Sequence, residues 1–269
     1  MNDSSLQRIP LVILGTGFTG TRIYHQAIKT GWQVLVTSRS PHLHLRDLPP
    51  AHRLHFDLAQ PDTWSAIPSP THILWCFPAA PLDLVKEFFA NRPRKSGRIL
   101  VMGSTSAYTP QERPITEQTP LRLHLPRVQG EEYLRTTLGA VIIRFAGLYG
   151  PNRNVLDWIR RGRIPNTPKW VNFLHVEDAA NICLQALERA EDGATYLASD
   201  GCPRTWEEIC TFASSKWGIS VPPFTPLKNI GKKVSIHKLL TELRYTVRFP
   251  DLYQVLDQLE SHSSSEEKA

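Results

Sequence analysis

A run of four apolar residues, Leu11–Leu14, is followed at once by glycines at positions 15, 17 and 20. The run is short enough for a buried strand, and residues 21–28 can be helical. Between a strand and a helix, Gly15 permits the tight turn, Gly17 lets a pyrophosphate approach the backbone, and Gly20 lets the helix pack closely. The first N–H groups of the helix would hold the anion. A plain glycine turn is the alternative. The predicted dinucleotide-binding residues here are Gly15, Thr16, Gly17, Phe18, Thr19 and Gly20.

The composition argues against several classes of protein. The 269 residues can bury a sizeable core, and 41% hydrophobic with 21% charged residues is ordinary for a globular protein. No apolar run approaches the roughly 20 residues that cross a bilayer, and the first residues lack the apolar core of a secretory signal. The net charge of +6 comes from scattered Lys and Arg rather than from a basic stripe. We therefore expect a cytoplasmic protein without nucleic-acid or membrane partners.

Cysteines and clustered basic residues could each mark a site. The chain has four cysteines, Cys76, Cys183, Cys202 and Cys210. They show neither CxxC nor metal-ligand spacing, so we interpret them as reduced thiols and expect no metal. The densest basic cluster consists of Arg153, Arg160, Arg161, Arg163 and Lys169. This cluster is either a solvated helix face or a clamp for a phosphorylated substrate.

Strand-like and helix-like patterns alternate through the first 150 residues. The candidate strands are Leu11–Leu14, Gln33–Ser38, Arg53–Phe56, His72–Cys76, Arg98–Met102 and Ala140–Phe145. The candidate helices between them are Thr19–Thr30, Asp62–Ile67, Leu82–Asn91 and Arg127–Leu138. This alternation predicts an α/β fold of Rossmann type with a doubly wound parallel sheet. Ligands of such sheets bind at the carboxyl ends of the strands. One cleft should be lined by the loops that start at Gly15, Ser38, Asp57, Phe77, Gly103 and Ala146.

Beyond Pro151 the alternation becomes irregular. The candidate helices there are Val155–Gly162, Val176–Ala190, Thr205–Trp217 and Ser235–Leu243, with short strands at Val171–Phe173 and Thr195–Leu197. We predict an NAD(P)-binding Rossmann domain over residues 8–150 and a smaller C-terminal substrate-binding region, intertwined with it, over 151–260. Residues 261–269, rich in Ser, Glu and Lys, are expected to form a flexible tail.

The end of the second candidate strand bears on the choice of cofactor. An NAD-binding Rossmann unit usually places Asp or Glu there, on the ribose hydroxyl. This strand ends instead in Ser38 and Arg39. A hydroxyl and a guanidinium would bind a ribose 2′-phosphate that a carboxylate would repel. The sequence therefore favours NADP over NAD, unless Arg39 merely caps a surface turn.

Several segments, taken in order, resemble the extended short-chain dehydrogenase/reductase (SDR) superfamily, in the NAD-dependent epimerase/dehydratase family. They are Phe56-Asp-Leu58, Gly103-Ser-Thr-Ser-Ala-Tyr108, Ile143-Arg-Phe-Ala-Gly-Leu-Tyr-Gly-Pro151, Asn172-Phe-Leu-His-Val-Glu-Asp178 and Lys233-Val-Ser-Ile-His-Lys-Leu-Leu240 with Phe249-Pro-Asp251. The small size and Trp75-Cys-Phe-Pro78 look most like the YeeZ-like branch of that family. The resemblance covers nearly the whole chain and implies a nicotinamide cofactor and a small-molecule substrate.

The resemblance also implies roles for individual residues. Asp57 would contact the adenine, and Phe77 would border the cofactor. Ser104, with Thr105 and Ser106 as register alternatives, would hydrogen-bond a substrate oxygen. The substrate side would include Tyr108, Tyr149 and His175. The structural alternatives are a helix N-cap at Asp57, a turn at 104–106 and a helix start at 175–178.

SDR chemistry rests on a Tyr-x-x-x-Lys pair that moves a proton during hydride transfer, and this chain lacks it. Aligning Arg127 with the lysine leaves Leu123 at the tyrosine position, and a register shifted by two residues pairs Leu125 with Gln129. Tyr133 comes too late in the segment, and the residue four positions after it is Thr137 instead of a lysine. His124 is the nearby group that titrates near neutrality. It is either a substitute acid/base or an exposed loop histidine.

Two functional hypotheses remain. The first is an NADP-dependent oxidoreductase or epimerase-like enzyme acting on a small polar or phosphorylated substrate, such as a nucleotide sugar. The second is a non-catalytic NADP-binding redox sensor; a purely structural domain fits poorly with the intact glycine loop. The persisting Gly103–Tyr108 loop favours the enzyme. The resemblance also allows a homodimer through Leu82–Asn91 and Arg127–Leu138, although neither segment has a decisive apolar excess.

Overall fold

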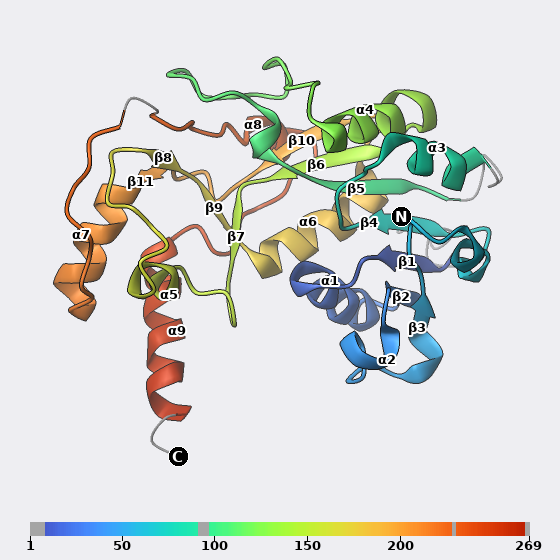
Figure 1. Cartoon of the computed structure of the whole chain (residues 1–269), viewed down its shortest axis with the longest axis horizontal. Helices are drawn as coiled ribbons and strands as arrows, with labels where there is room; N and C mark the ends of the chain where they lie inside the picture. The colour runs from blue at the N-terminus through green and yellow to red at the C-terminus, as the bar shows by residue number, and fades with distance from the viewer. Residues whose placement is uncertain (1–8, 91–96, 228–229, 267–269) are drawn as a thin grey trace. The chain divides into compact units, whose positions relative to one another are not determined.

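A computed structural model describes residues 9–90, 97–227 and 230–266 of the chain (Figure 1). Its seven-stranded sheet has the order β10-β6-β5-β4-β1-β2-β3. The strands are β1 Leu11–Leu14, β2 Val34–Ser38, β3 Arg53–His55, β4 His72–Trp75, β5 Ile99–Ser104, β6 Val141–Phe145 and β10 Thr195–Ala198. β1 pairs in parallel with β2 and β4, and the pairs β2–β3 and β4–β5 are also parallel. This strand order, which reverses at β1, confirms the predicted Rossmann-type α/β class.

Helices cover both faces of the sheet. Those associated with it are α1 Phe18–Lys29, α2 Pro41–His44, α3 Leu82–Ala90, α4 Pro126–Leu138 and α6 Val176–Arg189. Figure 1 shows α3 and α4 on one side of the sheet and α1 and α6 on the other. The chain is therefore doubly wound, as the alternating pattern predicts.

Burial explains why these segments fold as they do. Every residue of β1 is inaccessible to solvent, as expected for a strand covered on both faces. Helix α1 buries Gly20, Ile23, Tyr24 and Ala27. Their spacing of three and four residues places them on one face of a helix, which packs on the sheet. Near the other face, Trp75, Phe88 and aliphatic residues of β1, β4, β5 and β6 form an apolar cluster.

One predicted helix of this region differs from the structure in type, and two short helical segments were not predicted. The helix predicted over residues 62–67 is a 3-10 helix, Pro61–Ala66, with i to i−3 bonds from the N–H of Thr63 to the Gln60 carbonyl and from the N–H of Ile67 to the Trp64 carbonyl. The Pro- and His-rich stretch after β2 contains α2 and a 3-10 helix, Pro50–His52. The predicted helix end at Asn91 lies outside the described residues.

Contacts divide the chain into two compact units that we treat separately. Unit 1 comprises Met1–Ala107, Leu121–Arg144 and Ala180–Tyr196, and unit 2 comprises Tyr108–Pro120, Phe145–Ala179 and Leu197–Ala269. The predicted boundary at residue 150 stays a prediction. Unit 2 contains β7 Gly147–Tyr149, β8 Trp170–Val171, β9 Phe173–His175, β11 Arg204–Thr205, α5 Val155–Arg160, α7 Trp206–Trp217, α8 His237–Thr241 and α9 Leu252–Glu266. β7 and β9 pair in parallel, and β8 and β11 pair antiparallel.

In unit 2 the side chain of Asn172 divides the strand predicted over Val171–Phe173. Its amide donates to the carbonyl of Lys232 and accepts from the N–H of Val234, so β8 ends before it and β9 begins after it. Helix α8 is shorter than predicted, because the N–H of Ser235 donates to the carbonyl of Ile115. Residues 235 and 236 therefore precede the helix.

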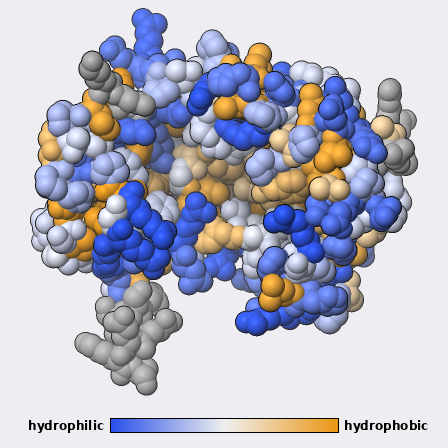
Figure 2. All heavy atoms as spheres, viewed as in Figure 1, coloured by the Kyte–Doolittle hydropathy of each residue, from blue (hydrophilic) through white to orange (hydrophobic). Residues whose placement is uncertain are grey.

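Helix α9 extends to Glu266, into the segment that the sequence analysis expects to be a flexible tail. Its buried residues Leu252, Val255 and Leu256 join an apolar cluster with α5 and α7, and this packing stabilises a helix whose polar end has little intrinsic signal. None of the described helices combines the length and apolar character of a membrane span. On the face shown in Figure 2, hydrophilic and hydrophobic residues are intermingled.

Asp178 ties two distant segments of unit 2 together. The residue is fully buried in α6, and its carboxylate accepts from the hydroxyl of Tyr245 at 2.5 Å. It also accepts from the backbone N–H groups of Arg248 and Phe249, each at 3.0 Å. These bonds satisfy a buried carboxylate and anchor the chain ahead of α9.

Candidate cofactor site

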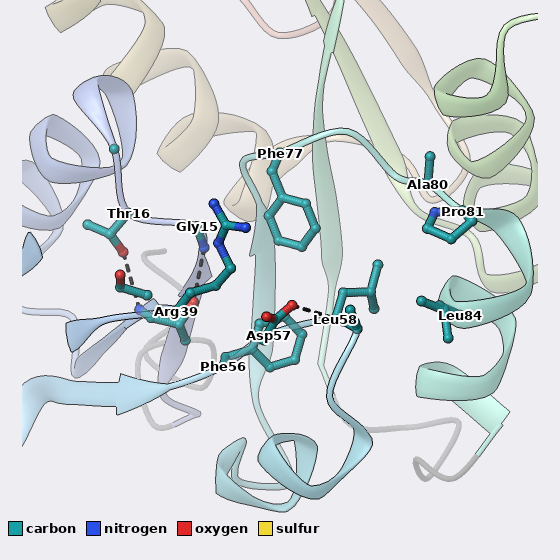
Figure 3. A pocket seen from close by; sticks show the side chains of 14 residues that line it. Gly15, Thr16, Arg39, Phe56, Asp57, Leu58, Phe77, Ala80, Pro81 and Leu84 are labelled. Carbon is teal, nitrogen blue, oxygen red and sulfur yellow. Dashed lines mark hydrogen bonds between the residues drawn. The ribbon is translucent and has the colours of Figure 1, made fainter.

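One cavity of about 440 Å³ lies in unit 1, at the carboxyl ends of β1, β2 and β3 (Figure 3). It is lined by Gly15, Thr16, Gly17, Thr37, Ser38, Arg39, Phe56, Asp57, Leu58, Ala59, Phe77, Ala80, Pro81 and Leu84. Four of the loops predicted to share one cleft, those starting at residues 15, 38, 57 and 77, therefore meet here. Phe18, Thr19 and Gly20 do not line the cavity.

The turn after β1 is held to β2 by backbone and threonine groups. The N–H of Gly15 donates to Thr37 Oγ1 at 3.0 Å, and the N–H of Thr16 donates to the Thr37 carbonyl at 3.0 Å. In return, the N–H of Thr37 donates to Thr16 Oγ1 at 3.2 Å. Gly15 has φ +83°, a conformation that favours glycine. The turn is therefore preorganised by the protein itself.

Gly17 and the start of α1 suit an anion. A Cβ at Gly17 would meet nothing within 4 Å, so the absence of a side chain leaves open space. Within the described chain, α1 has no side-chain cap and no acidic residue in its first turn. The positive end of its dipole is thus not offset by a local carboxylate. A Cβ at Gly20 would lie 3.2 Å from the Gly15 carbonyl oxygen, so this glycine permits close packing.

Ser38 and Arg39 both line the cavity but differ in how they are held. Ser38 is buried; its Oγ lies 3.0 Å from Nδ1 of His44 and accepts from the N–H of Ser40 at 3.1 Å. Arg39 is exposed. Figure 3 shows its guanidinium on the Gly15 side of the cavity. Arg39 is therefore the cationic group of the site, whereas the Ser38 hydroxyl already organises the turn.

The carboxylate of Asp57 is the acidic group in the lining. Its Oδ1 accepts from the N–H of Ala59 at 3.0 Å, so it shapes the turn after β3 as well as facing the cavity. The ring of Phe77 packs 4.7 Å from that of Trp75 and lies between Gly15 and the wall made by Pro81 and Leu84 (Figure 3). The site thus joins a polar anion cradle to an apolar wall that suits a planar base.

The sequence interpretation missed half of the lining. The missed residues are Thr37, Phe56, Leu58, Ala59, Ala80, Pro81 and Leu84. Several belong to the loop after β4 and the first turn of α3, where the pattern resembles an ordinary helix start. The signal that could have found them is the predicted loop at Phe77, which places its neighbours at the same sheet edge.

The serine loop after β5 forms a hydrogen-bonded chain within unit 1. Ser104 Oγ and Ser106 Oγ are 2.9 Å apart, and the N–H of Ser106 donates to Ser104 Oγ at 3.2 Å. Nη2 of Arg127 donates to Ser106 Oγ at 2.9 Å. Thr105 is buried in a 3-10 turn, Thr105–Ala107. The structural alternative, a turn at 104–106, is thus present, and the exposed hydroxyl belongs to Ser106.

The other proposed site residues lie in different surroundings. His124 is exposed in the loop before α4. Tyr108 and Tyr149 are fully inaccessible, and His175 is 5% exposed. In unit 2 the rings of Tyr149 and His175 make an edge contact at 5.3 Å. Burial is the main cause that raises the pKa of Tyr149 above its ordinary value, and the nearby Asp200 carboxylate adds to it. The phenol therefore keeps its proton.

The basic cluster of unit 2 is partly neutralised. The guanidinium of Arg160 pairs with Glu260 and with Asp157, and Arg153 stacks over the ring of Trp158 at 5.8 Å. The predicted phosphate clamp therefore has less available charge than the sequence suggests. All four cysteines are free thiols, as predicted.

No family model and no curated protein sequence matches the chain. A Methylobacillus flagellatus protein, described as a proposed NAD-dependent epimerase/dehydratase, matches with TM-score 0.80 and 23% identity over 95% of this chain and 99% of its own. The ADP-L-glycero-D-manno-heptose-6-epimerase of Helicobacter pylori matches with TM-score 0.75 and 15% identity over 97% of both chains. WbmG of Bordetella bronchiseptica, solved with NAD and UDP, matches with TM-score 0.76 and 17% identity over 94% and 96%. The chain therefore has the fold of the NAD-dependent epimerase/dehydratase structures.

Proposed function

We propose that the chain binds NADP(H) in this cavity and acts as an SDR-type oxidoreductase or epimerase-like enzyme. The observation that carries this proposal is the meeting of the glycine turn, Arg39 and Asp57 around one cavity. The open space at Gly17 and the uncapped start of α1 would receive the pyrophosphate. The apolar wall would receive the adenine, with Asp57 beside it.

The choice of NADP over NAD rests on Arg39. Its guanidinium would form charge-assisted hydrogen bonds to a ribose 2′-phosphate, and the strand end offers no carboxylate to repel that phosphate. The H. pylori and B. bronchiseptica relatives are an epimerase and a protein solved with NAD and UDP. They support a nicotinamide dinucleotide and a nucleotide-sugar substrate in general terms, and NADP is the finer proposal.

When bound, the nicotinamide would supply or accept a hydride. Ser104 would hydrogen-bond the substrate's carbonyl or hydroxyl oxygen and so orient it. In the absence of the Tyr-x-x-x-Lys pair, the proton would come from water or, through it, from His124. The reaction would therefore depend on orientation and charge more than on a side-chain acid.

A comparison of NADPH and NADH binding to wild type and Arg39→Ala tests the proposal. Binding is monitored during the cofactor titration by fluorescence energy transfer from the tryptophans to the bound cofactor. One of them, Trp75, packs against Phe77 of the cavity. Losing charge-assisted bonds to the 2′-phosphate should weaken NADPH binding by about 10- to 100-fold and leave NADH binding unchanged.

The matched control is Arg46→Ala. Arg46 lies in the same segment, forms a surface pair with Asp47 at 3.8 Å and does not line the cavity. The Arg46→Ala substitution should leave the affinities for NADPH and NADH unchanged. If wild type binds NADH more tightly than NADPH, or Arg39→Ala keeps its NADPH affinity, the assignment to NADP is wrong.

A non-catalytic NADP-binding sensor is the second candidate. It is favoured because the chain has no Tyr-x-x-x-Lys pair near α4 and both Tyr108 and Tyr149 are inaccessible. Turnover over a panel of carbonyl compounds and nucleotide sugars separates the two candidates. Turnover that Ser104→Ala abolishes supports the enzyme. Tight NADPH binding without Ser104-dependent turnover supports the sensor.

A further inference from the structure

The serine loop of unit 1 is hydrogen-bonded to the guanidinium of Arg127, which has no role in the proposed function. Arg127 Nη2 donates to Ser106 Oγ at 2.9 Å, while its Nη1 donates to Glu131 Oε1 at 3.1 Å. Glu131 is one turn along α4 from Arg127, so a helix fixes the spacing between them. The guanidinium is therefore held in one orientation, with one edge on Glu131 and the other on the serines.

The hydrogen bonds of the loop leave one serine hydroxyl proton available. A guanidinium only donates, so Ser106 Oγ must accept from Arg127. Ser104 Oγ and Ser106 Oγ share one hydrogen bond in which either hydroxyl can donate, and Ser104 Oγ also accepts the N–H of Ser106. In either direction one hydroxyl donates within the pair, and the proton of the other is left to point toward a ligand oxygen.

The charge of the network is unbalanced. Three guanidinium groups, those of Arg127, Arg135 and Arg144, share the carboxylates of Glu131 and Glu132. Burial raises the pKa of Glu131 despite its arginine partners. One positive charge is therefore left without a carboxylate inside the network.

Exposure decides where that charge can be used. The side chains of Arg144 and Glu131 are 1% and 3% exposed, whereas that of Arg127 is 22% exposed and Ser106 is exposed. Arg135 donates to Glu132 with two of its nitrogens and does not reach the serines. The side chain of Arg135 is 32% exposed, so its end of the network is accessible as well. The accessible end that carries hydroxyl groups is the group formed by Ser104, Ser106 and Arg127.

We propose that Ser104, Ser106 and Arg127 form a site for an anionic oxygen group of the substrate, a carboxylate or a phosphate. The serine hydroxyl that does not donate within the pair would donate to one oxygen, and the partly exposed guanidinium of Arg127 would supply the charge. The identity of the ligand as a substrate group rests on the proposed function, but the anion site itself does not. It is a binding site, and Glu131 is a positioning residue for Arg127.

The test follows the backbone amide of residue 106 by NMR in the full-length protein, because this N–H donates to Ser104 Oγ. Acetate, inorganic phosphate and neutral acetamide are titrated separately at constant ionic strength. We expect a saturable shift with acetate, with phosphate or with both, and none with acetamide. Acetate alone identifies a carboxylate site, and phosphate alone identifies a phosphate site. Equal shifts with acetamide, or no saturable shift with either anion, overturn the proposal.

Matched variants assign the site to Arg127. Arg127→Met should weaken anion binding about tenfold. Arg135→Met removes a charge from the same helix without touching the serines, and should leave binding within about twofold of wild type. Equal weakening by both variants would overturn the site in favour of a general charge effect.

Ser106→Ala keeps the Arg127–Glu131 pair and alters an exposed side chain, so it tests the site even if Arg127→Met fails to fold. We expect it to weaken anion binding, and an unchanged affinity would exclude the hydroxyl. NADPH binding to Ser106→Ala should equal that of wild type. A wild type that binds anions but not NADPH would refute the proposed function while leaving the anion site in place.

Discussion

Gly15, Gly17 and Gly20 lie within six residues and serve different physical purposes. At Gly15 the backbone has φ +83°, and a Cβ would lie 2.7 Å from the ring of Phe77. At Gly20 a Cβ would press on the Gly15 carbonyl oxygen at 3.2 Å. At Gly17 a Cβ would meet open space. Gly15 and Gly20 are therefore explained by the fold alone, whereas Gly17 leaves the space that the proposed cofactor would need to approach its backbone.

At the residue scale, Tyr149→Phe should preserve or raise stability. The hydroxyl of Tyr149 is buried and has no hydrogen-bond partner among the described residues. Burying such a group costs about 1–3 kcal/mol. Provided that the ring keeps its packing, removal of the hydroxyl should raise the free energy of unfolding by up to about 1 kcal/mol. Urea unfolding measures the change. A loss above about 1 kcal/mol would mean that the hydroxyl has a partner in solution.

At the scale of elements, tertiary packing decides which helices form where the local sequence pattern is weak. Helix α4 follows its predicted range, 127–138, because a proline begins it and Gly139, at φ +70°, ends it. Helix α9 was not predicted at all, since its stability comes from burying Leu252 and Leu256 against other helices. Local pattern thus predicts elements with strong caps and misses those that depend on tertiary contacts.

Gly130 in α4 provides the test at this scale. Alanine normally stabilises a helix by about 1 kcal/mol relative to glycine. A Cβ at Gly130, however, would lie 1.8 Å from the carbonyl oxygen of Ala79, a backbone atom of unit 1 that cannot move cheaply. The clash should win, and Gly130→Ala should lower the free energy of unfolding by about 2 kcal/mol or more.

The control is Gln129→Ala at the neighbouring exposed position, which should change stability by less than about 0.5 kcal/mol. Chemical denaturation of both variants measures the difference. A neutral or stabilising Gly130→Ala would show that α4 does not pack this closely on the loop after β4.

At the scale of the whole molecule, cofactor binding should raise thermal stability. A ligand that binds only the folded chain at 100 times its Kd adds about 2.7 kcal/mol, which for a chain of this size corresponds to about 5–10 °C in Tm. NADPH should therefore raise Tm more than an equal concentration of NADH does. In Arg39→Ala the two cofactors should give equal shifts. Equal shifts in wild type would contradict a site selective for the 2′-phosphate.

Half of the cavity lining was predictable from the sequence. Gly15, Gly17, Arg39 and Asp57 each follow a strand, and strands of a parallel sheet bring their carboxyl ends to one edge. The apolar wall was not predictable in the same way. Leu84 lines the cavity only because α3 begins where it does beside the sheet.

The sequence by itself determined the Rossmann-type class and the glycine turn, because strand alternation and glycine spacing are local patterns with few structural solutions. It also determined that the chain has no Tyr-x-x-x-Lys pair. Only the tertiary structure decided that Tyr149 is buried and that Arg127 holds Ser106. The reason is physical. Burial and hydrogen-bond partners depend on which residues, distant in sequence, the packed sheet and helices bring together.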